Sequence, residues 1–391
     1  DLEGKVAAAW ALGKGGVAEA VFKMALGNQI GFSSLDSIYL PALFEKNYGA
    51  IVVEATAPIN GAVLIGRTIA QPKIVLGDAS ISLDELTAIW EGTLEDVYPT
   101  RTEDHGTVKA YSFTARPDYT AKTKIARPKA VIPVFPGTNC EYDTARILER
   151  VGGHAEIVNV ANLTPVMLED SIARMEKALK DAQMMIFPGG FSFGDEPEGS
   201  GKFIAAFMRN PILTQRIHEL LYKNDGLILG ICNGFQALIK LGLVPYGKIV
   251  DTDAFSPTLT FNRIGRHQSR YVTTRIASVK SPWLSKVEVG DLHTIPISHG
   301  EGRFVCSDSL LEQLAANGQI ATQYVDFAGM PSMDVAHNPN GSCMAIEGIL
   351  SPDGRVFGKM GHSERIGTHI AKNIIGEKDQ KIFAAGVKYF L

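Results

Sequence analysis

After residue 128, short apolar runs alternate with segments of helical periodicity. The apolar runs are KAVIPVF, HAEIVNV, AQMMIFPG and GLILGI. The segments whose apolar residues recur every three or four positions are 141–151, SIARMEKALKDA, ILTQRIHELLYKN and FQALIKLG. Strands and helices that alternate in this way predict an α/β fold built on a parallel sheet.

The first 115 residues follow a different pattern, which predicts a mixed α+β domain. The opening stretch VAAAWALGKGGVAEAVFKMALGN is helix-like, whereas GAIVVEA and KIVLG are strand-like. Ser82, with Glu85 three residues later, predicts the start of a further helix. The glycines after Lys14 favour a helix cap over a phosphate site. Residues 116–128 are polar and contain prolines, so we expect a linker there and a second domain over residues 129–391.

The apolar run Leu227–Ile231 ends at Cys232, which lies between Gly230 and Gly234. This arrangement predicts a sharp strand-to-helix turn that presents a nucleophile. The helix N-terminus that follows the cysteine favours the thiolate, so we expect Cys232 to be reactive. An ordinary buried cysteine is the alternative, and it would be favoured if Cys232 stood alone.

A second apolar strand end carries His362, with Glu364 two residues later. Strand periodicity places these two side chains on one face. Glu364 can then hold one imidazole nitrogen while the other nitrogen takes the proton of Cys232. This is the arrangement of nucleophile, base and orienting group used in covalent acyl transfer.

Acyl transfer also needs two N–H donors that stabilise an oxyanion. The N–H of Asn233, directly after the nucleophile, is a natural donor. The second donor is expected from the loop Pro188-Gly189-Gly190-Phe191, although Pro-Gly and Gly-Gly are also generic turn signals.

Other positions could line the site. Gln236 lies one helical turn after Cys232 and could touch the substrate. Asn139 and Cys140 follow the first strand, but an asparagine in a PGTN turn more often makes local hydrogen bonds.

The composition limits the classes of function. Apolar residues make up 45% of the chain and charged residues 20%, with a net charge of −4, as in a soluble globular protein. The sequence has no apolar stretch long enough to span a membrane and no basic block, so neither a membrane nor a nucleic acid is expected as a partner. The four cysteines are widely spaced and lack a CxxC pair, which argues against structural zinc and disulfides. We therefore expect a reducing, cytoplasmic location.

Six segments resemble class I glutamine amidotransferases, and within that class the glutaminase part of phosphoribosylformylglycinamidine synthase. They are FPGTNCEYD, FPGGFSFGDE, GICNGFQALIKLGLVP, ISHGEGRF, NPNGS and GKMGHSERIG. The resemblance covers residues 128–391 and implies a flavodoxin-like, mostly parallel sheet with helices on both faces. It implies Cys232 as nucleophile, His362 as general base and then acid, and Glu364 as the third member of the triad.

The same resemblance assigns further positions. It implies that the second oxyanion donor is Gly190. It places His299 and Glu301, from ISHGEGRF, in the pocket wall or at an interdomain contact, and not in the role of base and orienting group.

Residues 1 to about 110 resemble the end of the aminoimidazole ribonucleotide (AIR) synthetase-like domain that precedes the glutaminase in the large-type synthase. The chain starts at Asp1 without an initiator methionine, so we expect a fragment. The resemblance implies L-glutamine as substrate, with no cofactor and no metal in the glutaminase domain. It implies that ammonia passes to formylglycinamide ribonucleotide, with ATP and Mg²⁺ used at synthase domains missing from this chain. Glutaminase turnover by the fragment alone is expected to be weak.

Two other classes of function stay open at this point. A cysteine peptidase or amidase with the same turn would cleave peptides or other amides. A catalytically silent binding scaffold would form no covalent adduct. An amidotransferase would instead be labelled at Cys232 by the glutamine mimic diazo-oxo-norleucine, and glutamine would suppress the labelling.

Overall fold

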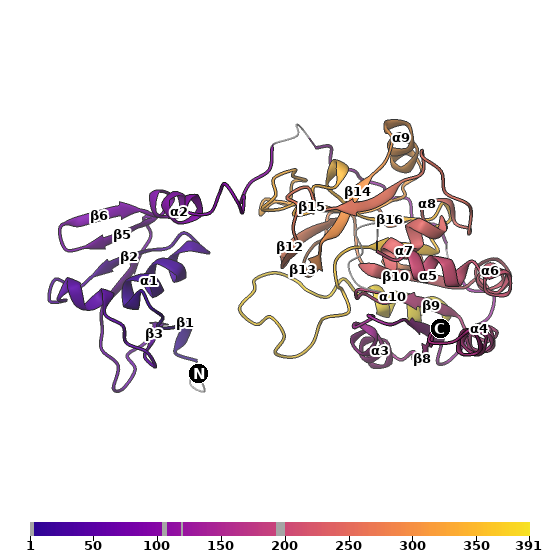
Figure 1. The fold of residues 1–391 in the computed structure, drawn as a ribbon, viewed down its shortest axis with the longest axis horizontal. Helices are drawn as coiled ribbons and strands as arrows, with labels where there is room; N and C mark the ends of the chain where they lie inside the picture. The colour runs from indigo at the N-terminus through magenta and orange to yellow at the C-terminus, as the bar shows by residue number, and fades with distance from the viewer. Residues whose placement is uncertain (1–3, 104–107, 119, 193–199) are drawn as a thin grey trace. The chain divides into compact units, whose positions relative to one another are not determined.

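The computed structural model describes residues 4–103, 108–118, 120–192 and 200–391. Contacts divide the chain into two compact units, and the boundary in the sequence lies between Thr100 and Arg101. Both units are drawn in Figure 1. Among the described residues, no helix is both long enough and apolar enough to cross a lipid bilayer.

The boundary between the units lies earlier than residue 115, where the sequence pattern had placed it. The N–H of Tyr111 donates to Gln323 Oε1 over 2.9 Å, and Arg116 donates to the carbonyl of Leu284 over 3.2 Å. The predicted linker 116–128 also packs on the larger unit, since the N–H of Ile125 donates to the carbonyl of Phe390 over 2.9 Å. This polar, proline-containing segment therefore packs along the larger unit, because its backbone groups find hydrogen-bond partners there.

The smaller unit contains a two-stranded sheet, β1–β3, and a four-stranded sheet in the order β4-β2-β5-β6. Its elements are β1 (Val6–Ala11), α1 (Gly16–Leu26), β2 (Gly31–Ser34), η1 (Leu40–Phe44), β3 (Ile51–Ala55), β4 (Gly66–Ile69), β5 (Lys73–Leu76), β6 (Ala79–Ser82) and α2 (Leu83–Gly92). The predicted mixture of helices and strands is confirmed, but the helical prediction for VAAAWA is wrong. These residues form β1, because antiparallel pairing with β3 overrides the helix preference of alanine.

Two helix starts in the smaller unit agree with the sequence pattern. Ser82 caps α2, since its side chain accepts a hydrogen bond of 3.1 Å from the N–H of Glu85. At the start of α1, the N–H of Gly15 donates to Glu19 Oε2 over 2.8 Å. An acidic side chain thus occupies a donor that a phosphate would need, in line with the favoured capping interpretation.

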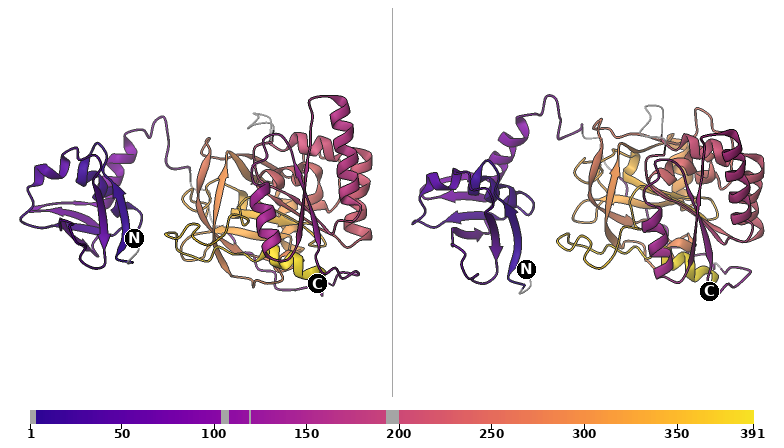
Figure 2. Two further views of the ribbon diagram at one scale, coloured as in Figure 1. Left: turned by 90° about the horizontal axis from the view of Figure 1, so that it is seen from below. Right: turned by 60° about the horizontal axis from the view of Figure 1, so that its bottom comes forward.

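The larger unit is built on a sheet in which the described residues form nine strands, in the order β13-β12-β15-β16-β17-β10-β9-β7-β8. Strands β8, β7, β9, β10 and β17 run parallel, and the remaining four extend the sheet in antiparallel pairs. Helices pack on both sides of the parallel strands (Figure 2). The predicted α/β fold is confirmed. The alternation of strands and helices, from which the sheet was predicted, reports only the parallel part and did not reveal the antiparallel extension.

The strands of the larger unit are β7 (Lys129–Val134), β8 (His154–Asn159), β9 (Met184–Phe187), β10 (Leu227–Ile231), β11 (Thr258–Phe261), β12 (Gln268–Ile276), β13 (Leu292–His299), β14 (Glu301–Val305), β15 (Ile320–Val325), β16 (Ile346–Leu350) and β17 (Val356–Lys359). Its helices are α3 (Glu141–Arg150), α4 (Pro165–Leu179), α5 (Lys202–Met208), α6 (Pro211–His218), η2 (Glu219–Lys223), α7 (Asn233–Leu241), α8 (Leu243–Tyr246), η3 (Pro282–Leu284), α9 (Asp308–Ala316), η4 (Cys343–Ala345) and α10 (Ile382–Phe390).

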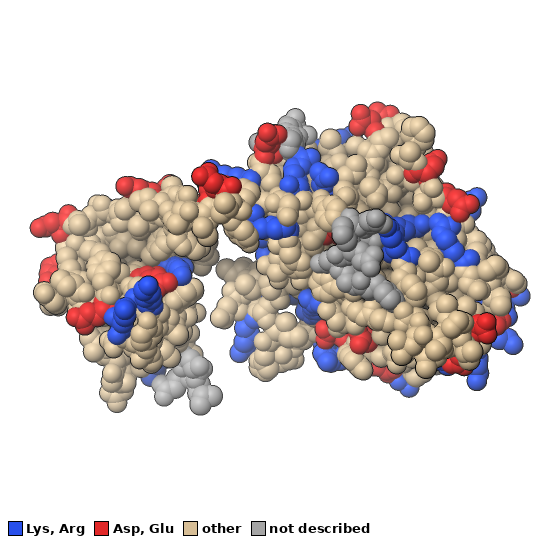
Figure 3. Space-filling view, viewed as in Figure 1, with Lys and Arg blue, Asp and Glu red and all other residues tan. Residues whose placement is uncertain are grey.

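Burial on both faces explains why the sequences of β9 and β10 are continuous apolar runs. Every residue of β9 and β10 is buried, as expected for parallel strands covered on both faces. Most charged side chains lie on the surface, and both signs are visible on each unit in Figure 3. The carboxyl ends of β9, β10 and β17 meet at one edge of the sheet, where ligands of such folds bind.

Candidate active site

Cys232 lies at the predicted strand-to-helix turn, between the end of β10 and the start of α7. Its backbone has φ 53° and ψ −106°, a strained conformation that costs about 1–3 kcal/mol. The two flanking glycines permit the turn. A Cβ on Gly230 would lie 2.8 Å from the carbonyl carbon of Gly234, and a Cβ on Gly234 would clash with the carbonyl of Phe187 on β9. The nucleophile turn predicted from the sequence is therefore present.

The Cys232 side chain is 3% exposed, and its sulfur lies 3.8 Å from the carbonyl oxygen of Ser298. Burial, with the nearby charges of Cys140 and Glu364, raises the pKa of this thiol to about 12. A hydrogen bond from the N–H of Asn233 acts in the opposite direction. The N–H at the start of α7 thus favours the thiolate as expected, but desolvation outweighs it in this conformation. Cys232 is a thiol that needs a base.

The histidine and glutamate lie close together, as predicted. His362 Nδ1 is 2.6 Å from Glu364 Oε1, and both side chains are almost fully buried. Their geometry differs from the prediction, since β17 ends at Lys359 and both residues sit in the turn that follows it. Burial would raise the pKa of Glu364, but the charge and hydrogen bond of His362 outweigh burial and lower it. Glu364 is therefore an ionised acceptor for the imidazole.

The nucleophile is beside this pair but not bonded to it. Among the described residues, His362 Nε2 is buried and has no hydrogen-bond partner, and no hydrogen bond joins it to Cys232. Backbone contacts nevertheless hold both residues at one sheet edge. The N–H of Cys232 donates to the carbonyl of Lys359 over 2.8 Å, two residues before Gly361 and three before the imidazole. Strand β13 touches both residues, because Pro296 accepts the N–H of His362 over 2.9 Å and Ser298 faces the sulfur.

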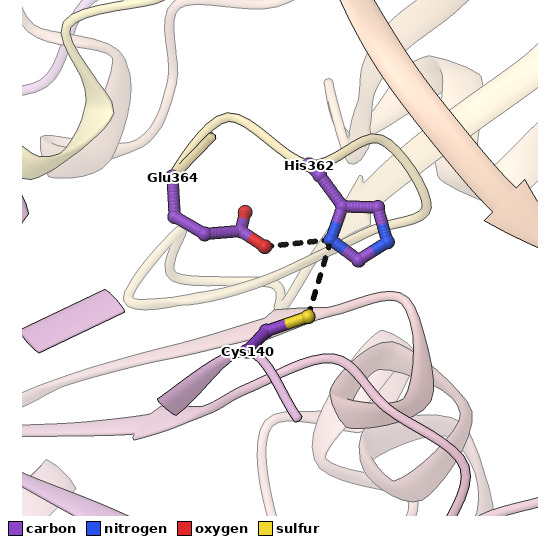
Figure 4. A group of neighbouring side chains, drawn as sticks. All are labelled: Cys140, His362 and Glu364. Carbon is purple, nitrogen blue, oxygen red and sulfur yellow. Dashed lines mark hydrogen bonds and ion pairs between the residues drawn. The ribbon is translucent and has the colours of Figure 1, made fainter. Parts of the chain in front are cut away.

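A second cysteine, Cys140, lies in the site, where the sequence had offered it only as a possible lining residue. Cys140 is fully buried, and its sulfur lies 3.8 Å from His362 Nδ1, on the side away from Nε2 (Figure 4). Its thiol also contacts the side-chain oxygen of Asn139 at 3.0 Å, so Asn139 makes the local hydrogen bond that was expected. Arg365 donates to the sulfur of Cys140 over 3.0 Å. The sequence signal was weak, since only the position of Cys140 after β7 pointed to the sheet edge.

Cys140, His362 and Glu364 are also the one group in the described part of the chain whose ligand atoms are close enough to share a metal ion. The surroundings do not suit a cation. The Arg365 guanidinium lies beside the Cys140 sulfur, and Glu364 already accepts the Nδ1 proton of His362. We therefore interpret the cluster as an acid–base arrangement, and no step of the chemistry is assigned to a metal.

The glycine loop lies against the imidazole. A Cβ on Gly189 would be 2.6 Å from His362 Cε1, so only glycine leaves room for the ring. Gly190 has φ 145°, and its N–H donates to no acceptor in the described residues. The neighbouring N–H of Phe191 is occupied, since it donates to the carbonyl of Gly137 over 2.8 Å. The N–H of Gly190 thus has no partner among the described residues, whereas that of Phe191 has one. The rest of the motif, residues 193–196, lies outside the described residues.

Asn233 and Gln236 connect the turn to its surroundings. The Asn233 side chain accepts the N–H of Ser192 over 3.3 Å and donates to Gln236 Oε1 over 2.9 Å. The other end of the Gln236 side chain donates to the carbonyl of Glu301. Both polar atoms of the Gln236 side chain therefore have partners. In this structure Gln236, which was predicted to touch the substrate, connects Asn233 to Glu301.

His299 and Glu301 do not form a second catalytic pair. His299 Nδ1 lies 3.2 Å from the side-chain oxygen of Asn262, and Glu301 Oε2 accepts the N–H of Ser200 over 2.9 Å. Burial lowers the pKa of His299 to about 3, so the ring is neutral and part of the site wall.

Comparison with known proteins agrees with this geometry. The model of the CobB/CobQ-like glutamine amidotransferase domain matches residues 127–390. The phosphoribosylformylglycinamidine synthase subunit PurQ of Aquifex aeolicus is 34% identical over 254 residues, which is 64% of this chain and 95% of the relative. The PurQ subunit of Treponema denticola is 34% identical over 283 residues, which is 68% of this chain and 100% of the relative.

The solved PurLQS structure from Thermotoga maritima contains a chain that is 28% identical, with a TM-score of 0.49, and the match covers 68% of this chain and 100% of that one.

A cysteine turn beside a glutamate-oriented histidine, on an α/β sheet, fits a glutamine amidotransferase, and the family match over residues 127–390 shows this class. The chain belongs to the CobB/CobQ-like glutamine amidotransferase family and, within it, to the glutaminases of phosphoribosylformylglycinamidine synthase. It is an enzyme of purine biosynthesis.

Proposed function

We propose that Cys232, His362 and Glu364 form the catalytic triad that hydrolyses glutamine in this chain. The observation that supports this most is the free Nε2 of His362. Glu364 holds the opposite ring nitrogen at 2.6 Å, and the elbow cysteine lies at the same edge of the sheet. The pattern matches the roles of base, orienting group and nucleophile.

In the proposed reaction, the Cys232 side chain leaves the Ser298 carbonyl and gives its proton to His362 Nε2 as the sulfur attacks the amide carbon of glutamine. The amide oxygen becomes an oxyanion, for which the N–H groups of Asn233 and Gly190 are the donors. The C–N bond then breaks, Nε2 returns its proton to the nitrogen, and ammonia leaves a thioester. Water, deprotonated by Nε2, attacks the thioester and releases glutamate and the Cys232 thiol.

A general base is required here because the thiol pKa of about 12 leaves almost no thiolate at neutral pH. Glutamine places an amide beside the sulfur, so proton transfer and attack occur together. A peptidase or general amidase would use the same three residues. The match to synthase glutaminases favours glutamine as the substrate.

The ammonia has an acceptor in this proposal. We infer that it passes to formylglycinamide ribonucleotide, in an ATP- and Mg²⁺-dependent reaction at synthase domains outside this chain. The names of the PurQ relatives as synthase subunits support an assembly of this kind. The smaller unit, residues 1–100, is then the end of an AIR-synthetase-like domain in a large-type synthase.

The two PurQ relatives match 64% and 68% of this chain, so the large-type arrangement needs a test of its own. Immunoblotting of the source cells with an antibody against residues 129–391 tests it. A large-type synthase gives a band well above the 42.2 kDa of this chain, whereas a band at about 42.2 kDa would contradict the large-type arrangement.

Labelling with diazo-oxo-norleucine tests the proposed triad. We expect mass spectrometry to find one adduct on Cys232, slowed by glutamine, and no adduct in Cys232→Ala. Cys306→Ser is the matched control, because it removes a cysteine outside the site. In the complete synthase, Cys232→Ala should abolish glutamine-dependent synthesis and spare ammonia-dependent synthesis. Glutamine hydrolysis that survives Cys232→Ala would refute the proposal, and absence of any adduct would favour a silent scaffold.

A further inference from the structure

A fully buried ion pair contacts Gly361, the residue that precedes His362. Lys359, the last residue of β17, places its Nζ 3.1 Å from Oε1 of Glu347 on β16, and both side chains are 0% exposed. Thr322 on β15 donates its hydroxyl to the other oxygen of Glu347. Two buried charges are costly even when paired, so the pair is unlike the exposed ion pairs elsewhere on this chain.

Both members of the pair hold the same residue, Gly361. Lys359 Nζ donates to the carbonyl of Gly361 over 2.7 Å, and the N–H of Gly361 donates to Glu347 Oε1 over 2.6 Å. β17 has ended at Lys359, so the ladder bonds of a sheet do not hold Gly361. The ion pair replaces those bonds and leaves neither backbone group of Gly361 unpaired in the interior.

Gly361 directly precedes His362, and the main chain of Lys359 contacts the nucleophile turn. The carbonyl of Lys359 accepts the N–H of Cys232 over 2.8 Å. One lysine therefore contacts the start of the nucleophile turn through its main chain and the loop of the base through its side chain. Space around Gly361 is also tight, because a Cβ there would lie 3.0 Å from Glu347 Oε1.

We propose that Lys359 and Glu347 are positioning residues for catalysis, which fix the imidazole of His362 relative to Cys232. This inference rests on the proposed triad. Loss of the pair removes the two side-chain hydrogen bonds that hold Gly361, and a displacement of the base by about 1 Å costs on the order of a hundredfold in rate. The proposed oxyanion donors, Asn233 and Gly190, lie on other segments, so we expect binding of glutamine analogues to be spared.

Removal of both charges separates positioning from stability. Replacing a buried ion pair by uncharged side chains is often neutral for folding, whereas removing one partner leaves an uncompensated charge. The double variant Lys359→Met/Glu347→Gln keeps an oxygen opposite the N–H of Gly361 and loses the donor to its carbonyl. We expect its melting temperature to stay near that of the parent chain.

The chain offers a control pair at the opposite end of β17. Arg355 precedes β17 and Asp225 precedes β10, their charged atoms are 3.1 Å apart, and Arg355 also donates to a backbone carbonyl, that of Leu221, over 2.7 Å. The double variant Arg355→Met/Asp225→Asn removes this pair far along the strands from the active edge.

Inactivation by diazo-oxo-norleucine, followed as the mass of the Cys232 adduct, reports chemistry and binding separately. For Lys359→Met/Glu347→Gln we expect the maximal inactivation rate to fall between about tenfold and a hundredfold. The concentration of diazo-oxo-norleucine that gives half of the maximal rate should change less than about threefold, because binding of the reagent before the reaction is unaltered. For Arg355→Met/Asp225→Asn the maximal rate should stay within a factor of about two, the range of a variant remote from the reacting atoms.

Equal maximal rates in the parent and the Lys359→Met/Glu347→Gln variant would overturn the inference, as would an equal loss in both double variants. If the first variant melts early, Thr322→Val, which removes only the hydroxyl contact to Glu347, gives the comparison in a milder form. An unchanged rate in a folded Thr322→Val variant would then count against the pair. Failure of the triad itself has a different signature, because labelling would then persist in Cys232→Ala.

Discussion

His362 Nδ1 lies 2.6 Å from Glu364 Oε1, and this contact settles which nitrogen of the ring is basic. The pKa of Glu364 is lowered, so its carboxylate is ionised and only accepts hydrogen bonds. Nδ1 therefore carries the proton, and Nε2 is left with a lone pair. Among the described residues Nε2 has no partner, so it is available for the proposed role of base toward Cys232.

Glu364→Gln should remove the lone pair from His362 Nε2 in most molecules while keeping the shape of the site. A glutamine amide can donate to Nδ1, which would move the ring proton to Nε2 and block the base. The maximal rate of Cys232 labelling should fall on the order of a thousandfold or more, as with tautomer-reversing changes in other triads. The control is Glu149→Gln, because Glu149 contacts His154 on the surface at 3.3 Å. A Glu364→Gln chain that is labelled at the parent rate would contradict the assignment.

Gly189→Ala should inactivate the enzyme for a steric reason. The new methyl group would lie 2.6 Å from His362 Cε1 and 3.1 Å from the sulfur of Cys140, so the imidazole must move. We expect labelling of Cys232 to slow by about a hundredfold, the scale of a misplaced catalytic group. Gly27→Ala, where a methyl group meets nothing within 4 Å, is the control. Retention of full activity in Gly189→Ala would show that the ring position is not fixed.

Much of this site could be read from the sequence because its parts are local signals. The turn at Cys232 follows from an apolar run that ends between Gly230 and Gly234, and the strand-to-helix geometry needs no distant information. The parallel half of the sheet is encoded in the same local way. His362 and Glu364 were found as a short motif, although the turn that joins them was mistaken for a strand.

Other parts depend on packing between distant segments, which local patterns do not report. The raised pKa of Cys232 arises from burial by the whole sheet edge, and it reverses the effect expected from the helix N-terminus. Cys140 meets His362 across 222 positions of sequence. The VAAAWA segment becomes a strand only because β3 pairs with it. Such features follow from tertiary contacts and not from periodicity.

His299 should make the larger unit sensitive to acid. Burial lowers the pKa of its imidazole from 6.5 to about 3, so the folded state stays neutral at pH values where the unfolded chain binds a proton. Stability from this group is present above pH 6.5 and is lost as pH falls toward 3. Between pH 7.5 and 5.0 the loss is about 2 kcal/mol.

Urea unfolding of His299→Gln measures that contribution. Trp283 is fully buried in the larger unit, so its fluorescence reports this unit once Trp10 and Trp90 of the smaller unit are replaced by phenylalanine. The free energy of unfolding should change with pH by about 2 kcal/mol less in His299→Gln than in the parent, because the other titrating groups are shared. Identical pH dependence in the two chains would mean that His299 is protonated in the folded state.

The four cysteines should react with iodoacetamide in an order that differs from their order with a glutamine mimic. Cys306 and Cys343 are partly exposed, and their sulfur atoms lie 3.8 Å apart. The hydrogen bond from Cys306 lowers the pKa of Cys343, so Cys343 holds more thiolate at neutral pH. Burial raises the pKa of Cys140 to about 11 and that of Cys232 to about 12, so both should react far more slowly.

At pH 7.5 we therefore expect iodoacetamide to modify Cys343 first, and Cys140 and Cys232 at least about a hundredfold more slowly, as their thiolate fractions dictate. Diazo-oxo-norleucine should modify only Cys232, because it fills the glutamine site and accepts the thiol proton at its diazo carbon as nitrogen leaves and the C–S bond forms. Peptide mass spectrometry after short exposures distinguishes the four sites. Early modification of Cys232 by iodoacetamide would mean that its thiolate exists before substrate binds.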